Sequence, residues 1–358
     1  MIYKRAEDVA KDLDLDNSQI KKMNTILDDY PMQITEYYYS LIDFDDPDDP
    51  IKKMSIPTLS EFDSDGSFDT SGEGDNTVLS GMQHKYLQTA LVLSTSKCAM
   101  YCRHCFRKRL VGVTDEEVVD HIDEIVEYIE EHPEISNVLV SGGDSFMNSN
   151  KILGKYLSKL TDIPHLDFIR FGTRMPVVEP TRISEDPQLL ELFEKYGKRK
   201  QLIVVTQFNH PREITEESIK AIQALRDINV EVRNQTVLLG GINDDPDVLA
   251  ELLRKMTSIG VFPYYVFQCR PVTGVKNTFQ IPLKRGVEIV EEAKGKQNGL
   301  GKSFRYCLSH PKGKIEILGA IPNGEYAFKF HETKDMEDNG RIFTMDLEDD
   351  QGWLYDID

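Results

Sequence analysis

The stretch CAMYCRHC at residues 98–105 decides the fold, because it places three cysteines within eight residues. Cys98, Cys102 and Cys105 have C-x3-C-x2-C spacing and follow an apolar run at 90–93 that is typical of a buried strand. Three thiolates on one short loop can hold three irons of a [4Fe–4S] cluster and leave the fourth iron open. Zinc prefers four ligands, often in paired knuckles, and the sequence contains no second knuckle. The spacing therefore favours a cluster over a zinc site or buried structural thiols.

An iron without a protein ligand is what a radical S-adenosylmethionine (SAM) enzyme requires. SAM chelates that iron, takes one electron from the cluster and is cleaved to a 5′-deoxyadenosyl radical, so the cycle also needs an external electron donor. The alternative from another functional class is an iron–sulfur electron carrier or sensor without catalysis. The polar residues that follow the later strands favour the enzyme.

Composition and charge limit the partners of the chain. Its 358 residues carry 61 acidic and 42 basic side chains, and the formal charge of −19 argues against general binding to nucleic-acid phosphates. The sequence has no apolar run of about 18 residues, and its charged N-terminus does not resemble a signal peptide. Five cysteines, three of them clustered, fit a reducing compartment better than a disulfide scaffold. We therefore expect a cytoplasmic protein with no nucleic-acid or membrane partner.

Beyond the cysteines, apolar runs alternate with amphipathic stretches, which is typical of right-handed βαβ units and a parallel sheet. Buried strands are expected at 90–93, 138–140, 168–171, 202–205, 230–239 and 264–267. Helices are expected at 114–132, 151–160, 188–196, 215–226, 246–258 and 284–294. Thr114 and Glu117 form a candidate capping box for the first of these helices. Six βα units fall short of the eight in a complete barrel, so the predicted fold is α/β with a partial (βα)6 barrel.

The chain divides into three predicted segments. Residues 6–29 have helical spacing, and Asp16-Asn17-Ser18 interrupts them and is a candidate cap for a second helix. Residues 64–74 are rich in Gly, Ser and Asp and are expected to form a linker or a surface loop. A hairpin with its turn near Asn339-Gly340 is expected in the tail. The predicted segments are an N-terminal helical extension at 1–80, the partial barrel at 81–300 and a C-terminal cover segment at 301–358.

Candidate cofactor ligands follow the predicted strands, at the edge where sites of parallel sheets form. Gly142 and Gly143 permit close approach to the backbone, and Asp144 is a candidate acceptor for the amino group of the SAM methionine. Further polar candidates are His104, Thr173, Arg174, Gln207 and Gln235. Taken singly, each of these is more typical of a structural role, and only their shared position indicates a cofactor site.

The cysteine loop also carries four cations, Arg103, Arg107, Lys108 and Arg109. The planar guanidinium of arginine forms bidentate pairs with carboxylates, so one of these residues is a candidate for binding an amino-acid substrate. By position, we choose Arg107 for the substrate carboxylate. The other cations are expected to neutralise cluster charge or to lie on the surface.

Seven segments resemble the lysine 2,3-aminomutase family of radical SAM enzymes, over a range from about residue 30 to about residue 300. They are TEYYYSLIDFDDPDDPIKKMSIPT, CAMYCRHCFRKR, VLVSGGD, RFGTRMPVVEPTRI, FNHPREITEES, NQTVLLGGIND and PYYVFQC. The resemblance implies a partial barrel, a cluster on the three cysteines, SAM beside 142–144 and Gln235, and a substrate carboxylate on Arg107. It also implies pyridoxal phosphate (PLP) as carrier of the migrating amino group, and a homo-oligomer assembled through the N-terminal helices.

The chain departs from this family where PLP would bind. The family's Pro-Gly-Gly-Gly-Gly-Lys loop is replaced by SHPKGKIEI at 309–317, in which Lys314, or with less support Lys312, takes the place of the imine lysine. Lys314 also fits a surface lysine that opens a half-exposed strand. Thr89 replaces the arginine that would bind the cofactor phosphate. The replacement cations considered for that phosphate are Lys302, Arg305 and Lys312.

A second departure concerns the substrate. Arg270 replaces the aspartate that holds a lysine ε-ammonium in the family, and a second such aspartate has no clear counterpart near Ser309. An uncompensated cation in a partly buried pocket costs several kcal/mol, so an acidic or neutral side chain is expected rather than L-lysine. Two hypotheses stay open. One is a PLP-dependent aminomutase that uses Arg107, Arg270 and Lys314, and the other is a PLP-independent radical SAM enzyme acting on an amino-acid-like or peptide substrate.

The remaining two cysteines give no sign of a further metal. The C-terminal cysteines with which some members of the family bind zinc are absent here, so no zinc is expected. Cys269 and Cys307 are expected to be buried thiols.

Overall fold

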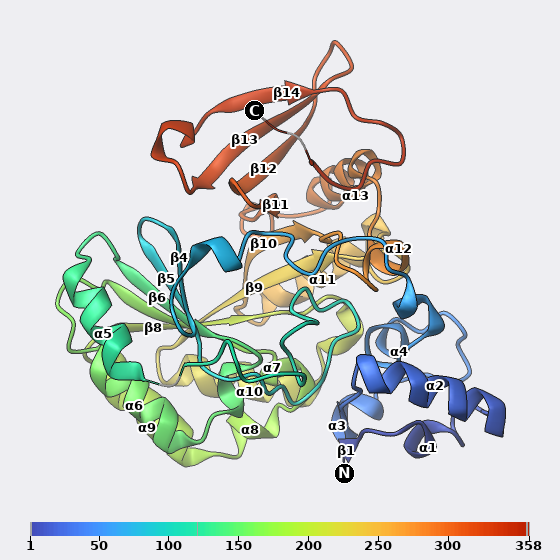
Figure 1. Cartoon of the computed structure of the whole chain (residues 1–358), viewed down its shortest axis with the longest axis horizontal. Helices are drawn as coiled ribbons and strands as arrows, with labels where there is room; N and C mark the ends of the chain where they lie inside the picture. Colours follow the sequence, from blue (N-terminus) through green and yellow to red (C-terminus); the bar gives the residue numbers. More distant parts are fainter. Residues whose placement is uncertain (1, 120, 356, 358) are drawn as a thin grey trace.

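One mixed sheet of twelve strands organises the computed structural model, which describes residues 2–119, 121–355 and 357 (Figure 1). The strands follow one another across the sheet in chain order, from β3 to β14. A separate small sheet pairs β1 (Ile2–Tyr3) with β2 (Ile34–Thr35). Parts of the segments predicted from the sequence fall outside the described residues, namely Met1, Asp120, Asp356 and Asp358.

Six strands form the centre of the sheet, and each pairs in parallel with the next. They are β5 (Thr89–Leu93), β6 (Asn137–Ser141), β7 (Phe168–Gly172), β8 (Gln201–Thr206), β9 (Glu231–Leu238) and β10 (Phe262–Gln268). Apolar β-branched residues such as Val138 and Val140 are fully buried, as expected for strands covered by helices. The α/β class and the six predicted strands are confirmed.

Amphipathic helices follow these strands and bury their apolar stripes. The long ones are α5 (Ile122–Glu131), α6 (Asn150–Leu160), α9 (Pro187–Gly197), α10 (Glu216–Asp227), α11 (Pro246–Ser258) and α13 (Leu283–Gly295). The short ones are α7 (Met175–Val178), α8 (Thr181–Ser184) and α12 (Lys276–Phe279). Within the described residues, no helix has the length and apolar character needed to cross a membrane.

The helix predicted for 114–132 begins only at Ile122, so its predicted capping box is wrong. Glu117 does not fold back onto Thr114 but pairs with Arg109 of the cysteine loop at 2.5 Å. A long-range ion pair has therefore replaced the local capping interaction, and the chain reaches α5 through turns.

Antiparallel strands flank the parallel centre on both sides. They are β3 (Thr77–Leu79) and β4 (Met82–Tyr86) before it, and β12 (Gly313–Ala320), β13 (Tyr326–Thr333) and β14 (Ile342–Met345) after it. Between β10 and β12 lies β11 (Arg305–His310), which is parallel to β10. The predicted hairpin of the tail is confirmed as β13 and β14.

The two flanks of the sheet approach each other. Lys85 Nζ in β4 donates to the carbonyl of His310 in β11 at 2.5 Å. Lys314 Nζ in β12 lies 5.4 Å from the ring centre of Tyr86 in β4. The sheet is therefore curved, while its description as a partial barrel stays a prediction.

The N-terminal helices, blue in Figure 1, precede the sheet. They are α1 (Ala6–Val9), α2 (Asn17–Asp29), α3 (Glu36–Tyr39) and α4 (Pro50–Ser55). Asp16 caps α2 as predicted, because its carboxylate accepts from the amide of Gln19 at 2.8 Å. In the predicted linker or surface loop at 64–74, Gly66 packs so tightly that a Cβ there would lie 2.5 Å from the carbonyl oxygen of Pro271. The predicted boundaries near residues 80 and 300 stay predictions.

Candidate active site

The cysteine loop follows β5 and is fixed by the N-terminal segment. Gln33 Nε2 donates to the carbonyl of Cys98 at 2.6 Å, and the amide of Tyr101 donates to the carbonyl of Gln33 at 2.9 Å. The amide of Arg103 donates to the carbonyl of Met54 in α4 at 3.0 Å. These contacts hold a loop without regular secondary structure in one conformation.

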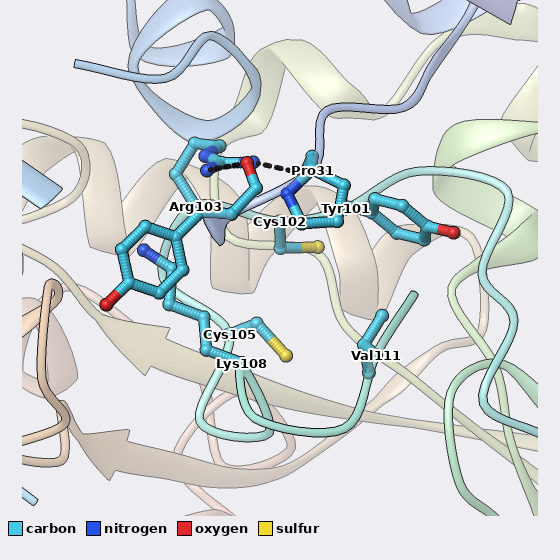
Figure 2. A pocket seen from close by; sticks show the side chains of 8 residues that line it. Pro31, Tyr101, Cys102, Arg103, Cys105, Lys108 and Val111 are labelled. Atoms are coloured by element: carbon cyan, nitrogen blue, oxygen red, sulfur yellow. Dashed lines mark hydrogen bonds between the residues drawn. The ribbon is translucent and has the colours of Figure 1, made fainter. Parts of the chain in front are cut away.

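The three thiols lie close enough to interact electrostatically. Figure 2 shows Cys102 and Cys105 beside one small pocket, which Tyr101 and Val111 also line. Burial raises the pKa of Cys98 and raises that of Cys105 to about 11, and the charge of Cys102 adds to both shifts. Among the described residues, no three His, Cys, Asp or Glu side chains are arranged for a single metal ion. A [4Fe–4S] cluster places each thiolate on a different iron, and three thiols on one loop are a donor set of the kind that it takes.

Arg174, which follows β7, joins the cysteine loop to the neighbouring strand ends. Its Nη1 donates to Cys102 Sγ at 2.8 Å, its Nε to the carbonyl of Gln207 at 2.9 Å and its Nη2 to Glu213 Oε1 at 2.5 Å. Burial lowers the pKa of Arg174, but the charges of Cys102 and Glu213 outweigh burial and raise it above its ordinary value. Arg174 is therefore a cation that contacts a predicted cluster ligand.

Asp144 is buried, and the protein itself binds its carboxylate. Thr173 Oγ1 donates to it at 2.6 Å, as do the amides of Arg174 at 2.6 Å and Phe146 at 2.9 Å. Burial raises the pKa of Asp144, and these donors act in the opposite direction. The structure thus brings Asp144 and Thr173 together as one bonded pair, while their contact with SAM stays a prediction.

Gly142 and Gly143 allow two segments of the chain to pack closely. A Cβ on Gly142 would lie 2.3 Å from the carbonyl oxygen of Thr95, and one on Gly143 would lie 2.3 Å from that of Lys97. Gly142 also has a φ of 115°, which other residues rarely adopt. The close approach that we predicted for a ligand is made here by backbone, which seats the loop after β6 against the start of the cysteine loop.

His104 is buried, and its neighbours define its tautomer. Asn209 Oδ1 accepts from the amide of Val237 at 3.0 Å, so Asn209 Nδ2 faces His104 Nε2 at 3.2 Å. Gln207 Nε2 approaches the same nitrogen at 3.0 Å. Nε2 is therefore the acceptor and Nδ1 carries the proton, yet Nδ1 has no hydrogen-bond partner among the described residues. Burial lowers the pKa of His104 well below its ordinary value, so the ring is neutral.

Gln235 lies in β9, next to the end of β8, since Thr206 pairs with Asn234. It occupies the half-buried face of β9, where exposure alternates with burial along the strand. Its side chain forms no hydrogen bond with the rest of the described chain, so it is free to bind a ligand. The predicted contact of Gln235 with SAM stays a prediction.

Two cations of the cysteine loop share one buried carboxylate, which the sequence did not indicate. Glu61 accepts from Arg103 Nη2 and from Lys108 Nζ, in both cases at 2.5 Å. Arg103 Nη1 also donates to the carbonyl of Pro31 at 2.9 Å (Figure 2). The side chains of Arg103 and Glu61 are each 2% exposed. These cations therefore fix the loop to the N-terminal segment instead of lying on the surface.

Arg107, the predicted substrate arginine, pairs with Glu73. Its Nε donates to Glu73 Oε1 at 3.1 Å, its Nη2 lies 3.0 Å from the same oxygen, and its Nη1 donates to the carbonyl of Gly142 at 3.3 Å. Arg109 Nη2 donates to Glu73 Oε2 at 2.7 Å. Burial opposes the ionisation of Glu73, but the charges of Arg107, Arg270 and Arg109 lower its pKa. A guanidinium has five N–H groups, so N–H groups on both Nη atoms of Arg107 remain for a carboxylate.

Arg270 follows β10 and lies near Arg107. Its Nη1 donates to Ser71 Oγ at 2.9 Å, and its guanidinium stacks on the Phe106 ring at 4.0 Å. Burial lowers the pKa of Arg270, Glu73 raises it and Arg107 lowers it further. The structure therefore brings two arginines together at this end of the sheet.

Lys314 lies between the two flanks of the sheet. Its Nζ donates to Glu332 Oε2 at 2.5 Å and lies 3.5 Å from the hydroxyl of Tyr265. Its side chain is only 12% exposed, so the alternative of a surface lysine is wrong. A side chain at this position is able to meet a cofactor bound inside the curve of the sheet.

The cations proposed for a cofactor phosphate do not gather around Lys314. Lys312 donates to a backbone carbonyl near the C-terminus, Arg305 is 44% exposed and Lys302 is exposed. The cation whose charge does reach Lys314 from the opposite flank is Lys85, in a strand that the sequence did not single out.

The family model of the Radical SAM superfamily matches residues 92–253, a range that holds the three-cysteine loop and the strands β6 to β9. Putative L-lysine 2,3-aminomutase of Aquifex aeolicus (strain VF5) is 40% identical over 338 residues, which are 94% of this chain and 90% of that protein. L-lysine 2,3-aminomutase of Clostridium subterminale is 41% identical over 280 residues, 77% of this chain and 64% of the relative. Glutamate 2,3-aminomutase of Clostridioides difficile (strain 630) is 39% identical over 282 residues, 78% of this chain and 65% of the relative. The chain belongs to the lysine 2,3-aminomutase family.

Family membership confirms the predicted type of enzyme and its predicted cofactors. The chain is an enzyme of the isomerase, aminomutase type. Its family uses a [4Fe–4S] cluster together with SAM, and its lysine aminomutase relatives also use PLP. The names of the relatives carry two substrates, lysine and glutamate.

Proposed function

We propose that this enzyme moves the α-amino group of an amino acid with an acidic or neutral side chain to its β carbon. The observation that carries this proposal is the pair of neighbouring arginines, Arg107 and Arg270. Two cations at one end of the sheet favour a substrate with two anionic groups, and disfavour one whose side chain is itself a cation.

The cysteine loop supports the radical chemistry. Cys98, Cys102 and Cys105 would hold the cluster, with Arg174 donating to the second of these sulfurs. When bound, the cluster and SAM supply a 5′-deoxyadenosyl radical that removes hydrogen from the substrate, with the electron coming from an external donor. His104 Nδ1 offers a buried N–H without a partner in the described chain, which suits an acceptor atom of SAM.

Arg107 is placed to orient the substrate. N–H groups on both of its Nη atoms remain after the hydrogen bonds to Glu73 and to the carbonyl of Gly142, and they can bind the two oxygens of a carboxylate. We assign them to the α-carboxylate. Glu73 then acts as a positioning residue, because it fixes the guanidinium from the other side.

Arg270 discriminates against lysine. A lysine ε-ammonium near this guanidinium would meet a like charge where a carboxylate is expected in the family, and such pairs cost several kcal/mol. A side-chain carboxylate would gain a bidentate partner instead. The name of the Clostridioides relative, glutamate 2,3-aminomutase, agrees with a substrate of this charge.

PLP would be held by Lys314, with Glu332 beside its amine. When bound, PLP carries the migrating amino group. The second candidate function is a PLP-independent radical SAM enzyme on an amino-acid-like or peptide substrate. One observation that favours it is the ion pair between Lys314 and Glu332, which occupies the amine that PLP would need. The other is Thr89, which contacts Asn137 and takes the place of the arginine that would bind the cofactor phosphate.

We also propose the architecture around this site. The curved parallel strands would form a partial (βα)6 barrel at 81–300, with residues 1–80 as a helical extension and 301–358 as a cover segment. The extension is the surface through which a homo-oligomer would assemble. Size-exclusion chromatography with light scattering tests this point, and a monomer would contradict it.

The reaction itself is tested with cluster-loaded protein, SAM, PLP and a chemical reductant under anaerobic conditions. L-glutamate, L-aspartate, L-glutamine and L-lysine are supplied in turn, and mass spectrometry follows 5′-deoxyadenosine and the β-amino isomer. We expect the isomer from an acidic or neutral amino acid, and at least about tenfold less from lysine. A preference for lysine contradicts the proposed substrate class. Formation of 5′-deoxyadenosine without any isomer favours the PLP-independent candidate.

A specificity variant sharpens this test. Arg270→Asp restores the aspartate that holds the lysine ε-ammonium in the family. This variant is expected to shift the substrate preference toward L-lysine. The matched control is Arg305→Asp, a like change on β11 at a side chain that is 44% exposed. An unchanged preference in Arg270→Asp contradicts the role of Arg270.

A further inference from the structure

Tyr38 in α3 belongs to the same buried hydrogen-bond chain as Arg174, although it lies in the N-terminal extension and not in the sheet. Its hydroxyl donates to Glu213 Oε1 at 2.7 Å, and Arg174 Nη2 donates to that same oxygen at 2.5 Å. Arg174 Nη1 in turn donates to Cys102 Sγ at 2.8 Å. Tyr38 and Glu213 are both fully buried. Two side chains, Glu213 and Arg174, therefore connect the hydroxyl of Tyr38 to a predicted cluster ligand.

The carboxylate of Glu213 is fully occupied by donors. Its Oε2 accepts from the amide of Asn209 at 2.6 Å and from that of His210 at 3.0 Å, while its Oε1 accepts from the two side chains. A carboxylate offers about four lone-pair sites, and these donors use them all. Because backbone amides hold Oε2 in place, the oxygen that responds to a change of donor is Oε1, which Tyr38 shares with Arg174.

The backbone around Tyr38 fixes its position. The amide of Tyr38 donates to Thr35 Oγ1 at 3.1 Å, which caps α3, and Thr35 Oγ1 donates to the carbonyl of Val178 in α7 at 2.5 Å. The helix α7 begins directly after Arg174. Burial raises the pKa of the Tyr38 phenol well above its ordinary value, and the charge of Glu213 adds to that shift. The hydroxyl therefore keeps its proton and acts as a donor.

We propose that Tyr38 is a positioning residue for the cluster, because its bond to Glu213 Oε1 limits the attraction of that oxygen for Arg174 and keeps the arginine on Cys102. A hydrogen bond lowers the negative charge on the shared oxygen. Without it, the guanidinium is drawn toward Oε1 and away from the sulfur. Both the weaker donation to sulfur and the more negative carboxylate disfavour the reduced cluster, which carries one more electron, so the reduction potential falls. The inference rests on the proposed ligation of the cluster by the three cysteines.

The neighbouring tyrosine supplies a matched comparison within the same helix. A buried tyrosine hydroxyl usually has a hydrogen-bond partner for stability alone. Tyr39 is buried like Tyr38, and its hydroxyl donates to Asp12 Oδ2 at 2.8 Å. No hydrogen bond in the described part of the chain joins Asp12 to the cysteine loop. Tyr38→Phe and Tyr39→Phe therefore remove the same kind of bond, and only the first is expected to change the cluster.

Redox titration of the cluster-loaded protein, followed by the electron paramagnetic resonance signal of the reduced cluster, tests this role. Tyr38→Phe should give a more negative reduction potential, an altered signal and formation of 5′-deoxyadenosine from SAM that is about tenfold slower. Tyr39→Phe should match the unaltered protein in all three measurements, although both variants lose stability to urea. An unchanged potential and signal in Tyr38→Phe, or an equal shift in Tyr39→Phe, overturns the proposal.

A second replacement separates the hydrogen bond from the packing of the ring. Incorporation of 3,5-difluorotyrosine at position 38 keeps the hydroxyl in place and makes it a more acidic and therefore stronger donor. The reduction potential is then expected to shift in the opposite direction, to a less negative value than that of the unaltered protein. A shift of the same sign in this protein and in Tyr38→Phe would show that packing causes it, and would overturn the proposal.

Failure of the cluster assignment and failure of the role of Tyr38 leave different signatures. If the unaltered protein binds no iron after anaerobic reconstitution, both are rejected. If it binds the cluster and Tyr38→Phe keeps its potential, the role of Tyr38 alone is rejected and the proposed reaction is unaffected.

Discussion

Arg174 Nη1 lies 2.8 Å from Cys102 Sγ, so a strand-end arginine directly contacts one of the three clustered thiols. The same guanidinium pairs with the fully buried Glu213, which fixes its position. Donors to the ligand sulfurs and nearby charge are among the features by which proteins set the potential of iron–sulfur clusters. We therefore expect Arg174, which the sequence indicated as a cofactor-binding residue, to influence the reduction potential of the cluster.

Arg174→Lys is expected to keep the cluster but to lower its reduction potential and to change its electron paramagnetic resonance spectrum, because lysine cannot make all three contacts at once. Turnover should fall about 10–100-fold, as for other residues that support metal ligands. Arg182→Lys in α8 is the control, since Arg182 pairs with Asp186. An unchanged potential and spectrum in Arg174→Lys would contradict the contact.

Replacement of any one of Cys98, Cys102 and Cys105 by alanine is expected to abolish the cluster, since it removes one of the three thiolates that would hold the irons. Iron and sulfide analysis after anaerobic reconstitution should fall from about four of each per chain to near zero. Cys269→Ala and Cys307→Ala remove buried thiols outside the motif and should leave the cluster intact. Loss of iron in these two controls, or its retention in Cys98→Ala, is the contrary result.

Glu61→Gln should destabilise the protein by about 3–5 kcal/mol, because Arg103 and Lys108 would be left buried without their shared counter-ion. Urea denaturation of the cluster-loaded protein measures this free energy of unfolding. Glu194→Gln breaks an exposed ion pair with Lys198 and should change stability by less than about 1 kcal/mol. Equal losses in the free energy of unfolding for the two variants would contradict this prediction, because the buried ion pair would then stabilise the protein no more than the exposed one.

Lys314→Ala is expected to abolish covalent attachment of PLP, which borohydride reduction and peptide mapping detect on the unaltered protein. Lys312→Ala is the matched control two residues away, and it should still be labelled. Label on another lysine would show that Lys314 does not bind PLP. If the unaltered protein carries no label and Lys314→Ala keeps full turnover, the PLP-independent alternative is established.

The sequence predicts the features that depend on neighbouring residues. The three cysteines and the six buried strands follow from spacing and apolar runs, and the start of α2 follows from the interruption at Asp16-Asn17-Ser18. Glu61 and Glu73 were not found, because they pair with arginines 42 and 34 positions away and lie in stretches whose acidic composition resembles solvated surface. Lys85 was not found either, because its contact with His310 forms only when the curved sheet brings β4 close to β11.

The account depends on a cluster whose fourth iron has no protein ligand and binds SAM. Electron–nuclear double resonance of the reduced, cluster-loaded enzyme, with SAM isotopically labelled at its amino nitrogen and carboxylate oxygen, measures that bond directly. The account predicts hyperfine coupling from both labels to the cluster. A cluster with three-cysteine ligation that shows no coupling from either label would contradict it.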